Sequence, residues 1–199
     1  LEGRTRGSAT FDSDDFDEIE FVKSIEAAKM SFAMYWYYTA KGLVLYLDEN
    51  PEAAFASLDR ALKMNPIAFT PEARYYGSLT ILALDRHEVT DEQERREAIL
   101  SRSMRDLETW AHACPANYLH KHLLVRAEYA RQTGDAELAM DLYDRALASA
   151  REHDWPRDLA IASELCAKFY LGRGRSRIAR AYMTDACYAY ARWGASVRL

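Results

Sequence analysis

Two short clusters around Pro115 hold the side chains best suited to chemistry. His112 and Cys114 precede this proline, and His120 and His122 follow it. Imidazole and thiolate groups are good zinc ligands, so a zinc-binding module or a small metal-dependent enzyme is one interpretation. However, residues two apart on a helix point to different faces, and the proline places a turn between the pairs. We therefore favour packed or surface roles for these side chains, with no metal and no cofactor.

Other catalytic patterns are weak. The sequence contains no GxxxxGK[ST] phosphate loop. The run Gly172-Arg173-Gly174 is too short for a dinucleotide fingerprint, and we interpret it as a turn between helices. No order of Ser, His, Asp or Cys is recognisable as a nucleophilic triad. We expect a protein that is not an enzyme.

Composition excludes several classes of function. The chain has 199 residues and a net charge of −5, which gives no support to a general role on nucleic acid or on a membrane surface. No apolar run approaches the roughly 20 residues of a membrane span. Three cysteines are too few and odd in number for a disulfide framework, so we predict a reducing, cytoplasmic location. The start at Leu1 suggests a fragment of a longer protein.

Apolar spacing predicts helices along most of the chain. Leu138, Leu142 and Tyr143, for example, fall on one face of a helix. Pro51 and Pro71 directly follow polar residues, and Pro156 comes after the polar pair His153-Asp154. Each is predicted to begin a helix, because the missing N–H is harmless there. No convincing strand pattern is present. Nine helices are predicted, near residues 16–26, 29–48, 51–64, 71–85, 91–113, 117–132, 135–152, 157–172 and 175–193.

The chain begins with a polar stretch that contains glycine. We predict an extended N-terminal arm over residues 1–15 and one helical domain over residues 16–199. The predicted helices follow one another with short linkers, as antiparallel helix pairs require. The expected fold class is therefore all-α.

Small residues recur at a fixed offset within this domain. Adding 40 to each of four positions returns the same residue types, which predicts stacked helix hairpins, because two helices approach closely only where side chains are small. The matching positions are Ala127, Gly134, Ala139 and Ala146, followed by Ala167, Gly174, Ala179 and Ala186.

This spacing resembles that of tetratricopeptide (TPR) repeats, which are helix–turn–helix units of about 34 residues. One unit starts at Tyr35 and carries small residues and a proline at the family's characteristic positions, and two further units start at His120 and Ala160. A degenerate unit lies between the first two. The resemblance covers about 35–193 and implies a right-handed superhelix of antiparallel hairpins. The matching residues of the first unit are Gly42, Ala54, Ala61 and Pro66.

In TPR stacks the first helix of each unit lines a concave groove. The resemblance therefore implies a partner that is a protein or peptide, or a neighbouring domain of the parent chain. The groove candidates by register are Trp36, Thr39, Leu43, Tyr46, Arg74, Lys121, Leu124, Glu128, Arg131, Glu164 and Lys168. An alternative stays open, in which the chain's own helix near 16–26 fills the groove.

Four longer blocks resemble the helical region of very large bacterial signalling proteins. In that family a serine/threonine-kinase-like domain and a STAND-type AAA ATPase lie upstream, and a GAF domain with a histidine kinase or another output lies downstream. The resemblance implies an interaction or signal-relay scaffold. The blocks are GRTRGSATFDSDDFDE (3–18), WAHACPANYLHKHLLVRAE (110–128), AMDLYDRALASAREH (139–153) and FYLGRGRSRIARAYMTDACYAYARWGA (169–195).

A homodimerising helical spacer is a further interpretation. Consecutive aromatic residues at 35–38 must spread around a helix, so some of them are expected to face outward. Arginines gather near 173–180, whereas acidic residues gather near 12–20. Complementary charges of this kind would suit contacts between copies of the chain or with neighbouring domains.

Overall fold

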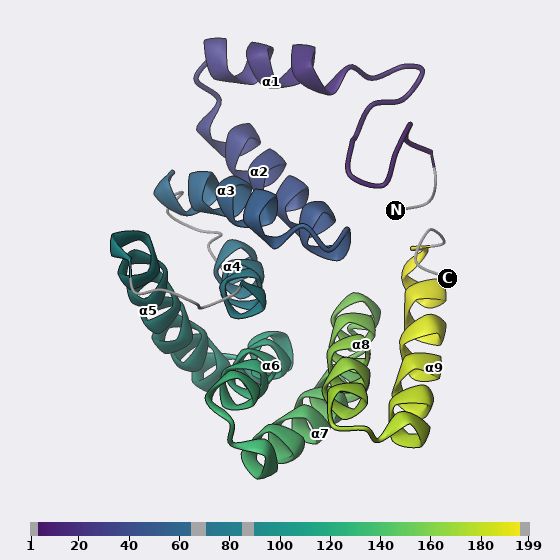
Figure 1. The fold of residues 1–199 in the computed structure, drawn as a ribbon. Helices are drawn as coiled ribbons and strands as arrows, with labels where there is room; N and C mark the ends of the chain where they lie inside the picture. The colour runs from purple at the N-terminus through teal and green to yellow at the C-terminus, as the bar shows by residue number, and fades with distance from the viewer. Residues whose placement is uncertain (1–3, 65–70, 85–89, 196–199) are drawn as a thin grey trace. The chain divides into compact units, whose positions relative to one another are not determined.

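A computed structural model of the chain describes residues 4–64, 71–84 and 90–195. Every regular element in these ranges is an α-helix, which confirms the all-α class (Figure 1). None of the helices in these ranges is both long and apolar enough to cross a membrane. The elements are α1 (Glu18–Ala27), α2 (Ser31–Leu47), α3 (Pro51–Lys63), α4 (Pro71–Ala83), α5 (Asp91–Ala113), α6 (Pro115–Thr133), α7 (Ala136–Glu152), α8 (Pro156–Gly172) and α9 (Ser176–Trp193).

The contacts between residues divide the chain into two compact units. The first is made by Gly3–Ser103 and the second by Met104–Leu199, so the boundary falls within α5. The single domain over residues 16–199 and the right-handed superhelix stay predictions.

Local capping explains why the helices begin where they do. The Asn50 side chain accepts a hydrogen bond from the first turn of α3, and Asp135 does the same for α7. Pro156 begins α8 as predicted. The sixth helix begins at Pro115, two residues before its predicted start, because a proline in the first helical position needs no hydrogen-bond acceptor. Pro66, the predicted end of the first repeat, lies outside the described residues.

In the first unit, α2 and α3 form a hairpin whose axes approach closely at Gly42. A Cβ atom built on Gly42 would lie 2.3 Å from Cγ of Leu58, which is completely buried. Ala54 and Ala61 of α3 are also completely buried. The small residues expected at this repeat's positions are therefore the ones that meet between the helices.

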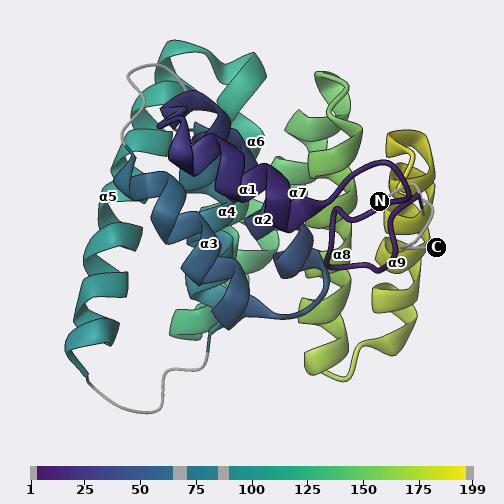
Figure 2. The same cartoon turned by 90° about the horizontal axis from the view of Figure 1, so that it is seen from above.

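In the second unit, α6 pairs with α7, and α8 pairs with α9. Figure 2 shows α8 and α9 side by side. Helix α8 also contacts both helices of the preceding hairpin. Gly134 and Gly174 adopt positive φ angles of 87° and 71° at the turns, as only glycine does without strain. The six alanines of the 40-residue repeat are buried, namely Ala127, Ala139, Ala146, Ala167, Ala179 and Ala186.

We expect Gly42→Ala to lower the free energy of unfolding by about 1–3 kcal/mol, because the added methyl group overlaps a buried leucine. Gly172→Ala is the matched control, since a Cβ atom there meets nothing within 4 Å. Its effect should stay within about 0.5 kcal/mol. Guanidinium unfolding followed by circular dichroism measures both variants. Equal stabilities would show that Leu58 moves aside without cost.

Candidate functional site

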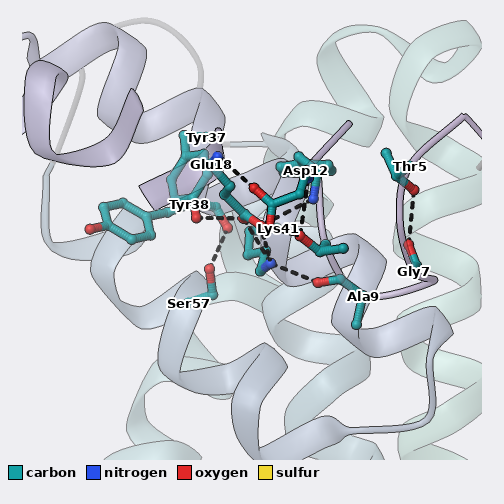
Figure 3. A network of polar contacts seen from close by, with 11 residues as sticks. Thr5, Gly7, Ala9, Asp12, Glu18, Tyr37, Tyr38, Lys41 and Ser57 are labelled. Carbon is teal, nitrogen blue, oxygen red and sulfur yellow. Dashed lines mark hydrogen bonds and ion pairs between the residues drawn. The ribbon is translucent and has the colours of Figure 1, made fainter. Parts of the chain in front are cut away.

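The carboxylate of Glu18 lies in a polar network that joins the N-terminal arm of the first unit to the helices beside it (Figure 3). Lys41 donates to the carbonyl of Ala9 at 2.6 Å and lies 2.7 Å from a Glu18 oxygen. The Tyr37 hydroxyl donates to the same carboxylate at 2.7 Å, and the backbone N–H of Phe11 donates at 3.0 Å. These bonds tie the non-helical residues before α1 to helix α2.

The electrostatics of Glu18 favour the charged form. Burial by itself would raise its pKa, but hydrogen bonds from Lys41 and Tyr37, with others from the arm, outweigh burial and lower the pKa to about 2. The carboxylate is therefore ionised at neutral pH. It accepts the hydrogen bonds that join the arm to α2.

A second buried carboxylate, Asp158, lies in the first turn of α8 in the second unit. It accepts from Lys121 at 2.5 Å and from the His120 ring at 2.9 Å, and all three residues are at most 2% exposed. The ring of Trp155 stacks on His120 at 5.5 Å between centroids. Burial would raise the pKa of Asp158, but the charge of Lys121 and the bond from His120 hold it well below its usual range.

The four candidate zinc ligands have different surroundings. His120 contacts Asp158, whereas the exposed His112 bonds the carbonyl of Glu108 at 2.8 Å within its own helix. His122 is buried, and its pKa is lowered mainly by burial. Cys114 is a half-buried free thiol. Within the described ranges, no group of three or more His, Cys, Asp or Glu side chains is arranged to hold a metal ion.

A third buried carboxylate, Glu128, joins the two helices of the α6–α7 hairpin. Arg131, one turn later on α6, donates to it at 2.9 Å, and the hydroxyl of Tyr143 on α7 donates to its other oxygen. Burial, with the charge of Glu128 beside it, raises the pKa of Tyr143 far above its usual value, so the hydroxyl keeps its proton. The Glu128 side chain is 5% exposed and the Arg131 side chain 36% exposed.

The α8–α9 hairpin repeats this arrangement. Glu164 on α8 accepts from Tyr190 on α9 at 2.6 Å and pairs with Lys168 at 2.9 Å. Its side chain is 10% exposed, whereas that of Lys168 is 46% exposed. In both hairpins, therefore, a glutamate carboxylate buried between the two helices holds a cation whose side chain is partly exposed to solvent.

The two cations border one pocket of about 260 Å³ in the second unit. Arg173, at the C-terminal end of α8, contributes a third positive charge to its lining. Phe169 provides an aromatic wall. The remaining lining residues are Gly134, Ala136 and Gly172.

The structure separates the predicted groove residues by exposure. Trp36 and Lys168 are exposed, and Tyr46, Arg74 and Arg131 are half-buried. The other six are buried, namely Thr39, Leu43, Lys121, Leu124, Glu128 and Glu164. Only Arg131 and Lys168 among the eleven line the described pocket, and a groove along all of these positions stays a prediction.

Sequence reasoning missed the partners of these side chains. Asp158, Tyr190 and the Glu18–Lys41 pair were not singled out, and Tyr143 was assigned only to an apolar helix face. One signal was present, because Glu128 and Glu164 are each followed by a cation three or four residues later. That spacing indicates an ion pair on a helix, but it does not reveal which tyrosine completes the arrangement.

We expect Glu18→Gln to increase hydrogen exchange in residues 5–16, because Lys41 loses its charged partner. The exposed Glu20→Gln, in the same first turn of α1, is the control. Exchange followed by mass spectrometry, with α6 to α9 as an internal reference, measures the effect. In the unchanged protein, arm protection should be lost as the pH falls from about 4.5 toward 2, because the folded-state pKa is the lower one. Equal protection in both variants would contradict a holding role for Glu18.

We expect Asp158→Asn to destabilise the second unit by about 3–5 kcal/mol, because the change leaves Lys121 buried beside an uncharged partner. Asp141→Asn, which breaks an exposed pair with Arg145, should cost less than about 1 kcal/mol. Denaturant unfolding at pH 7 and at pH 3 measures both.

Asp158 has a depressed folded-state pKa, so its contribution is present above about pH 4 and declines below that value. The Asn variant should therefore lose less stability than the unchanged protein between the two pH values. A variant as stable as the Asp141→Asn control would show that the buried pair is dispensable.

The comparisons with known proteins agree with this helical organisation. A family model described as "CHK1-like, TPR repeats" matches residues 19–185. No curated protein and no solved structure matches the chain. The matched span runs from α1 into α9, so it includes the whole α6–α7 hairpin, helix α8 and the first part of α9. The chain therefore belongs to the family of CHK1-like TPR repeats.

Proposed function

We propose that this chain is a non-catalytic scaffold that binds a peptide or protein segment along α6 and α8. The observation that carries the proposal is the repeated polar arrangement of the two hairpins. In each, a buried glutamate and a tyrosine fix a cation at the surface of the first helix, at Arg131 and at Lys168. Cations held in place lose little conformational freedom when a partner binds, which favours affinity.

The surroundings of the reactive side chains support a scaffold over an enzyme. Burial raises the pKa of the Cys166 thiol to about 12, so it stays protonated at neutral pH. The carboxylates of Asp158, Glu128 and Glu164 are bound by side chains of neighbouring helices. TPR repeats as a family serve mainly in protein–protein interaction, which also supports a scaffold.

We further propose that the scaffold relays a signal in the cytoplasm as part of a larger protein. Support comes from the sequence blocks at 3–18 and 169–195, which resemble the helical region of bacterial signalling ATPases and kinases. Binding on α6 and α8 would alter a stack in which each hairpin contacts its neighbours. A neighbouring domain is then one natural occupant. Homodimerisation stays a prediction, which light scattering across a concentration series tests.

A displayed library of random peptides, selected on the purified chain, tests the binding face. We expect enriched peptides to bind the double variant Arg131→Gln/Lys168→Gln about tenfold more weakly, because two charge-assisted contacts are lost. Lys121 is unsuitable for this test, since it is buried on Asp158.

The matched control is Arg145→Gln/Arg151→Gln, which removes two exposed arginines of α7. Its affinity for the same peptides should be unchanged within about twofold. If no peptide is enriched, or if both double variants bind alike, the α6–α8 face is not the binding surface.

A further inference from the structure

The pocket beside Arg131 and Lys168 is lined by positively charged side chains, which favour a negatively charged group as its ligand. We propose that it receives a carboxylate side chain, glutamate or aspartate, of the segment bound along α6 and α8. The proposal rests on the proposed function and specifies the chemistry of the partner. Three positively charged side chains line the pocket, and none of the lining residues that the structure describes is acidic.

The rim of the pocket is open to an incoming side chain. Gly134 lies at the turn after α6, and Gly172 is the last residue of α8. A Cβ atom built on either glycine would meet nothing within 4 Å. The lining cations come from α6, from α8 and from the residue that caps α8, and the two lining glycines leave open space where a side chain would stand.

One connected set of contacts positions two of the cations. Phe169 is 6% exposed and packs its ring against Tyr143, with 5.4 Å between centroids. The Arg173 guanidinium also lies over the ring of Phe169, 5.6 Å from its centroid. The Tyr143 hydroxyl binds Glu128, which in turn holds Arg131. Because these groups support one another, the pocket needs little rearrangement to accept a ligand.

The balance of charge favours a singly charged group. Arg131, Lys168 and Arg173 contribute three positive charges, and the paired Glu128 and Glu164 offset two of them. One positive charge remains. A carboxylate neutralises it and accepts hydrogen bonds from guanidinium and ammonium groups. A phosphoryl group brings close to two negative charges and would leave an excess beside two buried glutamates.

The peptides selected in the preceding experiment provide the probes. We expect them to share one acidic residue, and replacing it with glutamine should raise Kd about tenfold on the unchanged protein. Phosphoserine at that position should bind no better than glutamate. Fluorescence anisotropy of the labelled peptides measures each affinity, and added salt should weaken the acidic peptide more than its glutamine version.

Arg173→Glu tests the pocket from the protein side. Because this side chain is exposed, we expect its replacement to weaken the binding of the acidic peptide and to leave the affinity of the glutamine version unchanged. Arg180→Glu, an exposed arginine of α9 outside the pocket, is the control and should bind both peptides normally. If Arg173→Glu does not fold, as judged by circular dichroism, the peptide series on the unchanged protein decides the question.

The outcomes separate the two proposals. Peptides that depend on Arg131 and Lys168 but share no acidic residue, or that tolerate glutamine, overturn the carboxylate pocket and leave the binding face intact. Tighter binding of phosphoserine than of glutamate also overturns it. Failure to obtain any peptide that depends on these two cations overturns the binding face, and the pocket with it.

Discussion

Helices of this chain can pack as they do because small residues stand at their points of contact. At Gly42 the space that a Cβ atom would need is already filled by Leu58. The repeated alanines of the second unit are buried at the same kind of contact. Close approach brings side chains of neighbouring helices within hydrogen-bond distance, and the bonds of Tyr143 to Glu128 and of Tyr190 to Glu164 depend on that approach.

Buried carboxylates are the second constraint. A carboxylate that leaves water must gain hydrogen bonds or an opposite charge, or its burial is too costly. Asp158 gains them from Lys121 and His120, which lie on α6 of the preceding hairpin. Glu128 and Glu164 gain them from a tyrosine across the hairpin and a cation on the same helix. The first arrangement joins successive hairpins, whereas the other two hold surface cations in place.

Much of the fold could be predicted because its signals are local. Apolar periodicity, Asn50 and Asp135 as caps, and glycines at the turns each act within one or two helical turns, so the predicted helices agree with the structure to within a few residues. The start of α6, which was predicted two residues too late, is also set locally, because Pro115 occupies the first helical position. The candidate site was harder, because its partners lie on different helices. Glu128 meets Tyr143 only after α6 and α7 have packed, and no spacing in the sequence specifies that contact.

The sequence by itself determined the helical class, the hairpin turns and the family of repeats, since these depend on residue size and on local backbone chemistry. Tertiary structure decided which charged residues are buried and which remain accessible to solvent. Lys121 and Lys168 both lie on first helices, yet one is buried on Asp158 and the other borders the pocket. A helix position fixes only the direction of a side chain. The neighbouring helix decides whether water or a buried carboxylate meets it there.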